Sequence, residues 1–398
     1  MSCLPDRSAR PSALRATLRR AARCLLPFLL APAVLAAQRP TTQIDAAITD
    51  GIRDRLFPGA VVVVGRSDTV LFERGYGSYA WGTDSRRPDP AWSLWDVASL
   101  SKVVATASAT AVLVDRGRLQ LQAAVHQLVP PFTGTGKDSV TVEMLLNHTS
   151  GLPAWARLSA NGADPRHARE TLFGIDLRRA PGESPLYSDL NAMLAAMAVE
   201  RASGESFEQF TVDSVFRPTG MLNATWRPTA ADKLRSVPTQ LLPDGTSIMG
   251  TVNDANADVL GGVAGHAGVF ATGEDLARFA QTWLRTVRGT DSSWVSRNTA
   301  LRFLERSESS GTRALGWDTP RLLEDGVISL YGRCATRSTY GHTGFTGTLI
   351  WFDPVADLFV VLLTNRSYDP APRSMALIRD VRAAVSDAAR RLAGERCG

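Results

Sequence analysis

Short runs of branched apolar residues stand near both ends of the chain, each bounded by turn-forming residues. Residues 61–64, all valine, and residues 69–72 are separated by Gly-Arg-Ser-Asp, which predicts a tight β-hairpin. Near the other end, residues 348–352 and 358–364 flank an Asp-Pro turn and also have strand character. We expect the two ends of the chain to share one antiparallel sheet.

Helical periodicity follows the first hairpin and returns later in the chain. From Ser99, apolar residues recur at helical spacing as far as Val114, and Gly117 ends the run. Residues 190–197 predict a second, Met-rich helix among long connections rich in glycine, proline and asparagine. A last helix is predicted at about residues 372–392.

These elements predict an α+β fold with an antiparallel sheet flanked by helices and built from both chain ends. The α/β lobe would comprise about residues 38–115 and 262–398, and a mostly helical lobe, about residues 116–261, would be inserted between them. Active sites are common where two such lobes meet.

The first 37 residues are typical of a secretory signal peptide. Six arginines precede an apolar run at residues 25–37, whose small residues at the end predict cleavage near Ala36-Ala37. The run is shorter than the roughly 20 residues that span a bilayer, and it contains Pro27 and Pro32. We therefore expect residues 38–398 to be exported to the periplasm or secreted, without a stable membrane span; an uncleaved signal anchor is the alternative.

Net charge changes once this segment is removed. The whole chain has a formal charge of +5, and residues 1–37 contain six Arg and one Asp, so residues 38–398 have a charge of 5 − (6 − 1) = 0. A neutral chain without a helix-turn-helix, zinc-finger or RNA-binding signature is a poor candidate for nucleic-acid binding. We therefore do not expect nucleic acid as a partner.

Cysteine and histidine usage predicts neither a metal site nor a cofactor. Two cysteines leave with the signal, and Cys334 and Cys397 remain, so a disulfide between them is possible in an oxidising compartment. The five histidines are scattered singly, without the spacing of zinc ligands.

Ser99 and Lys102 are the first candidate catalytic residues. At positions i and i+3 of a helix they lie on one face and can hydrogen-bond, whereas Ser101 points elsewhere. A serine hydroxyl needs a neighbour that takes its proton, and a buried lysine whose pKa is lowered can do so. Only three of the 44 basic residues are lysines, so a lysine inside an apolar helix is notable.

Two later motifs offer further candidates. Tyr187 opens the Met-rich helix and can carry a proton, although a packed tyrosine beside a helix cap is the simpler interpretation. The glycine-rich segment 341–347 precedes the strand at 348–352, where glycines let a substrate approach an edge strand, and His342 and Thr343 would face it. Taken alone, this segment is better explained as a turn with a structural histidine.

Three motifs follow one another along the chain in the order typical of the penicillin-binding protein and serine β-lactamase superfamily. They are Ser-x-x-Lys at 99–102, Tyr-x-Asp at 187–189 and His-Thr-Gly at 342–344. The chain resembles this superfamily over nearly all of residues 38–398, including the loop at 145–153 and the strands at 351–366. The resemblance implies the β-lactamase-like fold and a serine hydrolase.

The resemblance also implies a role for each motif residue. Ser99 would be the acylated nucleophile, Lys102 its proton partner and Tyr187 the general acid and base. His342, Thr343 and Gly344 would line the sheet edge beside the substrate. The backbone N–H groups of Ser99 and Phe345 would form the oxyanion hole.

Two residues depart from the pattern of β-lactamases and most D,D-peptidases. Asp189 stands where asparagine is usual, and His342 stands where lysine is usual, so a substrate carboxylate would be held less well. These variants resemble the class C-like branch that includes esterases and cell-wall amidases.

The segment at 253–268 resembles muramoyl-alanine amidases and carboxypeptidase-like relatives. Its Asp254, Asn256 and His266 either line the substrate pocket or stabilise a loop between the lobes. His148 and Asn147 are interpreted as structural.

The leading hypothesis is an exported serine hydrolase that forms an acyl-enzyme at Ser99 and cleaves an amide or ester bond in peptidoglycan fragments. Its expected partner is a small-molecule substrate or a cell-wall peptide or glycopeptide. A true β-lactamase or D,D-carboxypeptidase is the alternative. A non-catalytic binding protein on the same fold is a third hypothesis, disfavoured because Ser99, Lys102 and Tyr187 are all present.

Overall fold

A computed structural model describes residues 40–82, 85–161, 164–323, 326–328, 330–369 and 375–397. The predicted signal peptide and its cleavage site lie outside the described residues. Residues 38–398 form a single compact unit, so the predicted division into two lobes at 115/116 and 261/262 stays a prediction.

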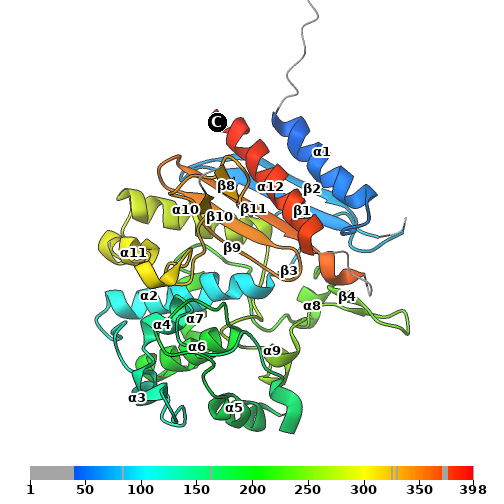
Figure 1. Cartoon of the computed structure of the whole chain (residues 1–398). Coiled ribbons are helices and arrows are strands. Elements are labelled where there is room, and N and C mark those ends of the chain that lie inside the picture. The colour runs from blue at the N-terminus through cyan, green and yellow to red at the C-terminus, as the bar shows by residue number, and fades with distance from the viewer. Residues whose placement is uncertain are drawn as a thin grey trace, which may run out of the picture. The chain divides into compact units, whose positions relative to one another are not determined.

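A five-stranded antiparallel sheet joins the two ends of the chain (Figure 1). Its strand order is β2-β1-β11-β10-β9, with bounds Val70–Gly77, Gly59–Gly65, Leu358–Thr364, Leu349–Asp353 and Tyr340–Thr343. Val62 of β1 pairs with Leu362 of β11, about 300 residues later. The expected hairpin and the expected sheet from both chain ends are confirmed.

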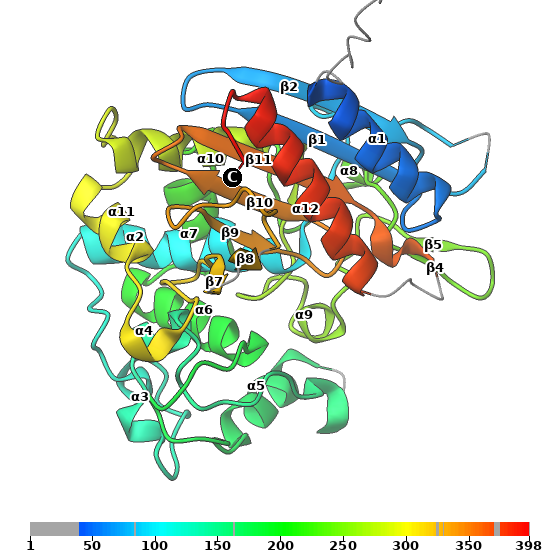
Figure 2. The same ribbon diagram turned by 45° about the horizontal axis from the view of Figure 1, so that its top comes forward.

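Helices cover both faces of this sheet. On one face, α1 (Pro40–Arg53) and α12 (Met375–Leu392) lie side by side, as Figures 1 and 2 both show. On the other face lies α10 (Gly273–Arg288). Alternate residues of β1 enter the two cores, Val62 on the α12 side and Val61 on the α10 side, which explains why an unbroken apolar run forms this strand.

The middle of the chain is mainly helical. Its helices are α3 (Val125–Leu128), α4 (Val142–Leu146), α5 (Pro165–Gly174), α6 (Asp189–Ser203), α7 (Phe207–Thr211), α8 (Ala230–Lys233) and α9 (Ala255–Val259). Beyond it, α11 (Arg297–Leu304) packs on α10. Three short strand pairs complete the described part: β3 (Trp95–Asp96) with β6 (Phe270–Ala271), β4 (Gln240–Leu241) with β5 (Ser247–Ile248), and β7 (Arg321–Leu323) with β8 (Gly326–Ile328).

The segment that begins at Ala98 runs through the centre of the molecule. A single 3₁₀ turn, η1 (Ala98–Leu100), leads into a π-helical stretch, η2 (Lys102–Ala107), and then into α2 (Ser108–Asp115). Among the described residues, this is the one helix long and apolar enough to cross a membrane, and 83% of it is buried inside the protein. It is therefore a core helix.

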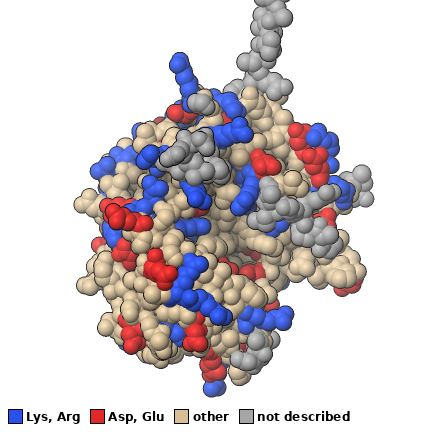
Figure 3. Space-filling view, viewed as in Figure 1, with Lys and Arg blue, Asp and Glu red and all other residues tan. Residues whose placement is uncertain are grey.

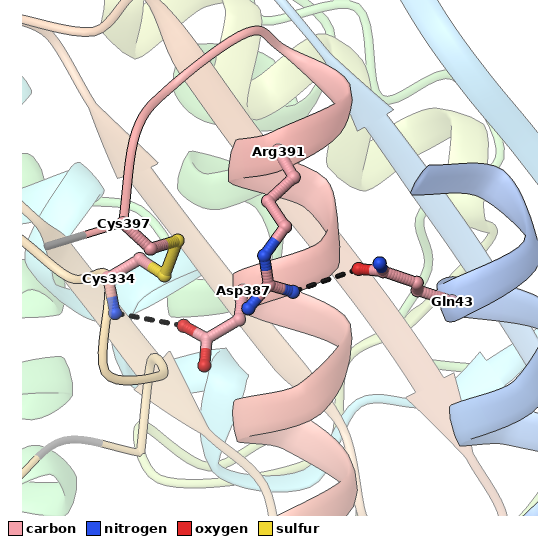
Figure 4. The surroundings of a disulfide bond; sticks show 5 residues. All are labelled: Gln43, Cys334, Asp387, Arg391 and Cys397. Carbon is pink, nitrogen blue, oxygen red and sulfur yellow. Dashed lines mark hydrogen bonds between the residues drawn. A yellow bond between two sulfur atoms is a disulfide. The ribbon is translucent and has the colours of Figure 1, made fainter. Parts of the chain in front are cut away.

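Polar contacts fix α12 against the rest of the fold. The ion pair between Arg390 and Asp353 at the end of β10 is fully buried, with an N–O distance of 2.9 Å. Cys334 and Cys397 are joined by a disulfide, and Asp387 accepts a hydrogen bond from the Cys334 N–H (Figure 4). These contacts tie the end of the chain to the loop that precedes β9.

Basic and acidic side chains lie interspersed on the face shown in Figure 3.

Candidate active site

A cavity of about 660 Å³ opens beside the edge strand β9. Eight of the residues predicted for the site line it: Ser99, Tyr187, Asp189, Asp254, His342, Thr343, Gly344 and Phe345. Lys102 contacts Ser99 from the buried side. The structure therefore brings together motifs separated by up to 240 residues along the chain.

Two predicted pocket residues lie outside this lining. Asn256 is buried, and its amide accepts a hydrogen bond from the Leu158 N–H and donates one to the Ala156 carbonyl. Of the two expected roles of Asn256, these contacts favour stabilisation of a loop over substrate binding, because both ends of its amide are bonded within the protein. His266 is also buried, and it supports the site from behind.

Ser99 lies in the 3₁₀ turn at the start of the central helix, half-buried and facing the cavity. The Lys102 ammonium donates to Ser99 Oγ at 2.9 Å, as the i, i+3 spacing predicts. Ser101 faces the opposite way, where its hydroxyl accepts the Val269 N–H. Of Ser99 and Ser101, it is therefore Ser99 that presents its hydroxyl to the cavity.

The charge state of Lys102 differs from the expectation. Its Nζ is surrounded by Ser99 Oγ at 2.9 Å, the His266 carbonyl at 3.2 Å and Asp189 Oδ1 at 2.7 Å. Burial opposes the charge, but the Tyr187 oxygen and the Asp189 carboxylate outweigh it and raise the pKa of Lys102. Because its pKa is raised, Lys102 is an ammonium, which has no lone pair for the Ser99 proton.

Tyr187 stands in the centre of the cavity between two histidines. Its ring centroid lies 4.8 Å from that of His148 and 5.8 Å from that of His342. The Lys102 ammonium and the Arg313 guanidinium each lie 5.0 Å from the Tyr187 ring centroid. The Tyr187 ring thus has two cationic and two imidazole side chains around it.

Both histidines beside Tyr187 are neutral. Burial, followed by the charges of Arg313 and Lys102, lowers the pKa of His148 well below its usual value. Its Nδ1 accepts the Ser188 N–H at 3.2 Å, so His148 holds the start of α6 in place, in agreement with its structural interpretation.

Burial and the nearby Lys102 also lower the pKa of His342. His342 Nδ1 lies 2.9 Å from the Thr343 carbonyl and must therefore donate to it. A neutral imidazole thus occupies the position where the superfamily usually has a lysine.

Asp254 and His266 form a pair beneath the cavity. His266 Nε2 lies 2.8 Å from Asp254 Oδ1, and the His266 carbonyl accepts from Lys102. Burial alone would raise the pKa of Asp254, but its bond to His266 and the charge of that ring lower it to about 2. The pair therefore combines both earlier interpretations: Asp254 lines the cavity, and His266 stabilises the loop behind it.

The turn after β9 packs against the segment that carries Ser99, where the oxyanion hole is expected. A Cβ on Gly344 would lie 2.7 Å from the Val97 carbonyl, so glycine is required for the turn to lie against the Ser99 segment. Arg382 donates to the Gly344 carbonyl at 2.8 Å, and Arg366 donates to the Phe345 carbonyl at 2.9 Å. The Phe345 backbone is therefore held rigidly beside the nucleophile.

The cavity lining also includes residues that the sequence motifs do not mark, among them Asp96, Trp155 and Arg313. Trp155 and Arg313 lie in irregular segments outside the three motifs, and neither has a sequence pattern that marks it. Asp96 stands only three residues before Ser99, and its proximity to the nucleophile was the available signal.

Comparisons with known proteins agree with this geometry. A family profile described as Beta-lactamase matches residues 44–384. A putative D-alanyl-D-alanine carboxypeptidase of Escherichia coli (strain K12) is 27% identical over 82% of this chain and 82% of its own length. An N-acetylmuramyl-L-alanine amidase of Bacillus subtilis (strain 168) is 29% identical over 79% of this chain and 78% of its own length.

The fold has solved counterparts. The crystal structure of a class C β-lactamase superposes with a TM-score of 0.69 and 20% identity, covering 87% of this chain and 97% of that one. This similarity concerns the fold, and it confirms the expected α+β, β-lactamase-like architecture. With the family profile spanning most of the sequence, the chain belongs to the β-lactamase family and is a serine hydrolase.

Proposed function

We propose that the protein is an exported serine hydrolase that forms an acyl-enzyme at Ser99 and cleaves an amide bond in peptidoglycan fragments. The observation that supports it most strongly is the contact of Ser99 Oγ with a buried, fully coordinated Lys102 in a cavity that also contains Tyr187. The arginine-rich, then apolar, first 37 residues support export.

The proposed reaction begins with attack of Ser99 Oγ on the substrate carbonyl. Tyr187 takes the hydroxyl proton and later passes it to the leaving amine, while the Lys102 ammonium stabilises the negative charge that develops on Oγ. The carbonyl oxygen is held by the N–H groups of Ser99 and Phe345. Water then attacks the ester carbon and gives a proton to Tyr187, and Tyr187 passes this proton to Ser99 Oγ as the ester bond breaks and the acid product leaves.

Two names among the relatives imply different substrates. A D-alanyl-D-alanine carboxypeptidase acts on an amide next to a free carboxylate, whereas an N-acetylmuramyl-L-alanine amidase acts on an amide between sugar and peptide. One observation favours the carboxypeptidase as the second candidate. Arg313 lies in the cavity beside Tyr187, and neither of its terminal nitrogens donates a hydrogen bond to any described residue.

Arg313 compensates for the missing lysine in this second candidate. Its Nε lies 3.6 Å from Asp318 Oδ1, which orients the guanidinium and leaves the two terminal nitrogens available. Those nitrogens offer paired donors that match a carboxylate. The charge argument against a carboxylate substrate, which rested on His342 and Asp189, therefore does not hold for the cavity as a whole.

The experiment uses residues 38–398 with a disaccharide-pentapeptide muropeptide, nitrocefin and p-nitrophenyl esters, with product masses as readout. Loss of the terminal D-alanine supports the carboxypeptidase, and separation of sugar from peptide supports the amidase. In the first case, Arg313→Gln raises KM more than tenfold, whereas Arg321→Gln, on the β7 strand outside the cavity lining, leaves KM unchanged. Rapid turnover of nitrocefin without muropeptide cleavage would contradict the proposal.

Export is tested separately by expressing the full chain and sequencing the N-terminus of the periplasmic product. The proposal predicts cleavage near Ala36-Ala37. Retention of the full-length chain in the cytoplasm would contradict it.

A further inference from the structure

Asp96 is a buried carboxylate three residues before the nucleophile, and it has no basic partner among the described residues. It is only 2% exposed, and it stands on β3 and lines the cavity. Its Oδ1 accepts the Ala98 N–H and its Oδ2 accepts the Asn253 N–H, both at 2.8 Å. An unpaired charge in such a place requires a reason, since burying it is unfavourable.

The first bond fixes the backbone that carries Ser99. Ala98 has a φ of +50°, in the left-handed region that residues with a Cβ rarely adopt. The bond from the Ala98 N–H to Asp96, two residues earlier, is the local turn by which aspartate stabilises such a backbone. Asp96 therefore offsets the strain at Ala98 and orients the next residue, Ser99.

The second bond fixes the loop that holds Lys102. Asn253, which donates to Asp96, directly precedes Asp254, and Asp254 pairs with His266. The His266 carbonyl is one of the three acceptors around Lys102. One carboxylate thus connects the segment of the nucleophile with the loop that positions its ammonium partner.

We infer that Asp96 is a positioning residue, which fixes the position of Ser99 relative to the His266 loop. It does so by accepting one backbone N–H on each carboxylate oxygen. The inference rests on the proposed role of Ser99 as the nucleophile. It assigns Asp96 no contact with the substrate.

The ionised form of Asp96 is the one that performs this role. A protonated carboxyl would direct an O–H toward one of the two N–H groups and lose that bond. Burial, with a contribution from the Asp254 charge, raises the pKa of Asp96 to about 6.

Other titratable groups face this region from the surrounding elements. They are Lys102 on the central helix, His342 on β9, and Asp254 and His266 on the adjacent loops. Because the pKa of His342 is well below its usual value and that of Asp254 is about 2, neither of these two groups explains a transition near pH 6, and the Asp96→Asn variant described below distinguishes Asp96 from His266. We expect acylation of Ser99 to fall as the pH drops below about 6.

The test measures the rate at which a fluorophosphonate probe labels Ser99 in residues 38–398, because this readout does not depend on the natural substrate. Asp96→Asn keeps the shape but turns an N–H donor toward one of the two backbone N–H groups. We expect labelling to slow at least tenfold at pH 8 and the decline below pH 6 to disappear. The matched control is Asp244→Asn. Asp244 accepts the Thr246 N–H with the same two-residue spacing, but it lies in an exposed hairpin. We expect the labelling rate and pH profile of this variant to equal those of the wild type.

A second variant separates positioning from general damage. Glycine adopts positive φ without strain, so Ala98→Gly removes the need for Asp96 to hold that backbone. The loss caused by Asp96→Asn is therefore at least threefold smaller in the Ala98→Gly background, and thermal unfolding of each variant reports on the fold. Wild-type labelling in Asp96→Asn, or a loss that Ala98→Gly does not reduce, would overturn the inference. Absence of labelling at Ser99 in the wild type would instead overturn the proposed function.

Discussion

Replacement of Asp189 by asparagine removes the carboxylate that is paired with Lys102 and leaves the shape of the side chain almost unchanged. The ammonium is 3% exposed and the Nζ to Oδ1 distance is 2.7 Å, so the pair is buried on the lysine side. Asparagine still offers an oxygen to Lys102 but no charge. The variant therefore asks whether Lys102 acts on Ser99 as a cation or as a proton acceptor.

The size of the effect follows from the geometry. Two unit charges at this distance attract with about 6 kcal/mol at an effective dielectric constant of about 20. The amide oxygen retains part of this attraction, and disruption of buried pairs usually destabilises a protein by about 3 to 5 kcal/mol. We expect Asp189→Asn to lower the free energy of unfolding by about 3 kcal/mol.

The pH dependence of this loss has a defined sign. The pKa of Lys102 is raised in the folded state, so its contribution is fully present below the pKa of the unfolded lysine, about 10.4. It is lost only as the pH rises through the folded value. The difference in stability between the two proteins should therefore be constant between about pH 6 and 9.

Urea unfolding and the rate of acylation by p-nitrophenyl acetate measure the two consequences. We expect acylation at pH 7 to fall at least tenfold, because the ammonium that stabilises negative charge on Ser99 is held less firmly. Glu170→Gln, which breaks the exposed pair with Arg166, is the matched control and should change stability by less than about 0.5 kcal/mol. Faster acylation in Asp189→Asn would refute the reasoning, since it would mean that Lys102 acts as a free amine.

Two further predictions concern the general acid and base and the C-terminal disulfide. Tyr187→Phe keeps the ring between His148 and His342 but removes the proton carrier. The kcat should therefore fall about 10²- to 10⁴-fold, while the melting temperature changes little. A kcat within threefold of the wild type would exclude Tyr187 from proton transfer. Cys397→Ser removes the disulfide with Cys334, which spans a sequence separation of 63 residues. We expect urea unfolding to show a free energy of unfolding lower by about 2 to 4 kcal/mol, with kcat unchanged. An unchanged urea midpoint would contradict this prediction.

The fold was largely predictable because its signals are local. The valine run at 61–64 and the strand at 358–364 are apolar enough to be buried on both faces, and in the structure they are the adjacent strands β1 and β11. The pairing itself was expected from the similar character of the two ends. Its register, in which Val62 faces Leu362, depends on the packing of α12 and α10 and has no local signal.

The site was predictable where its residues form short motifs and unpredictable where they meet only in space. Ser99, Tyr187 and His342 were found because their order along the chain matches a superfamily pattern. Arg313 was missed, because its place beside Tyr187 depends on the loop before β7.

The pKa of Lys102 differs from the expectation for a similar reason: a lowered pKa was expected, and the structure raises it. Burial was anticipated from the apolar helix, but the 2.7 Å contact with Asp189 connects two different segments. Asn256 illustrates the converse: it is a polar residue in a motif that resembles cell-wall amidases, yet both ends of its amide are bonded within the protein.

The central claim is that Ser99 is the nucleophile, and mass spectrometry of the fluorophosphonate-labelled protein tests it most directly. The account predicts one adduct per chain on the peptide that contains Ser99, its complete loss in Ser99→Ala, and its retention in Ser101→Ala, whose hydroxyl faces Val269 instead of the cavity. An adduct that persists in Ser99→Ala would contradict it.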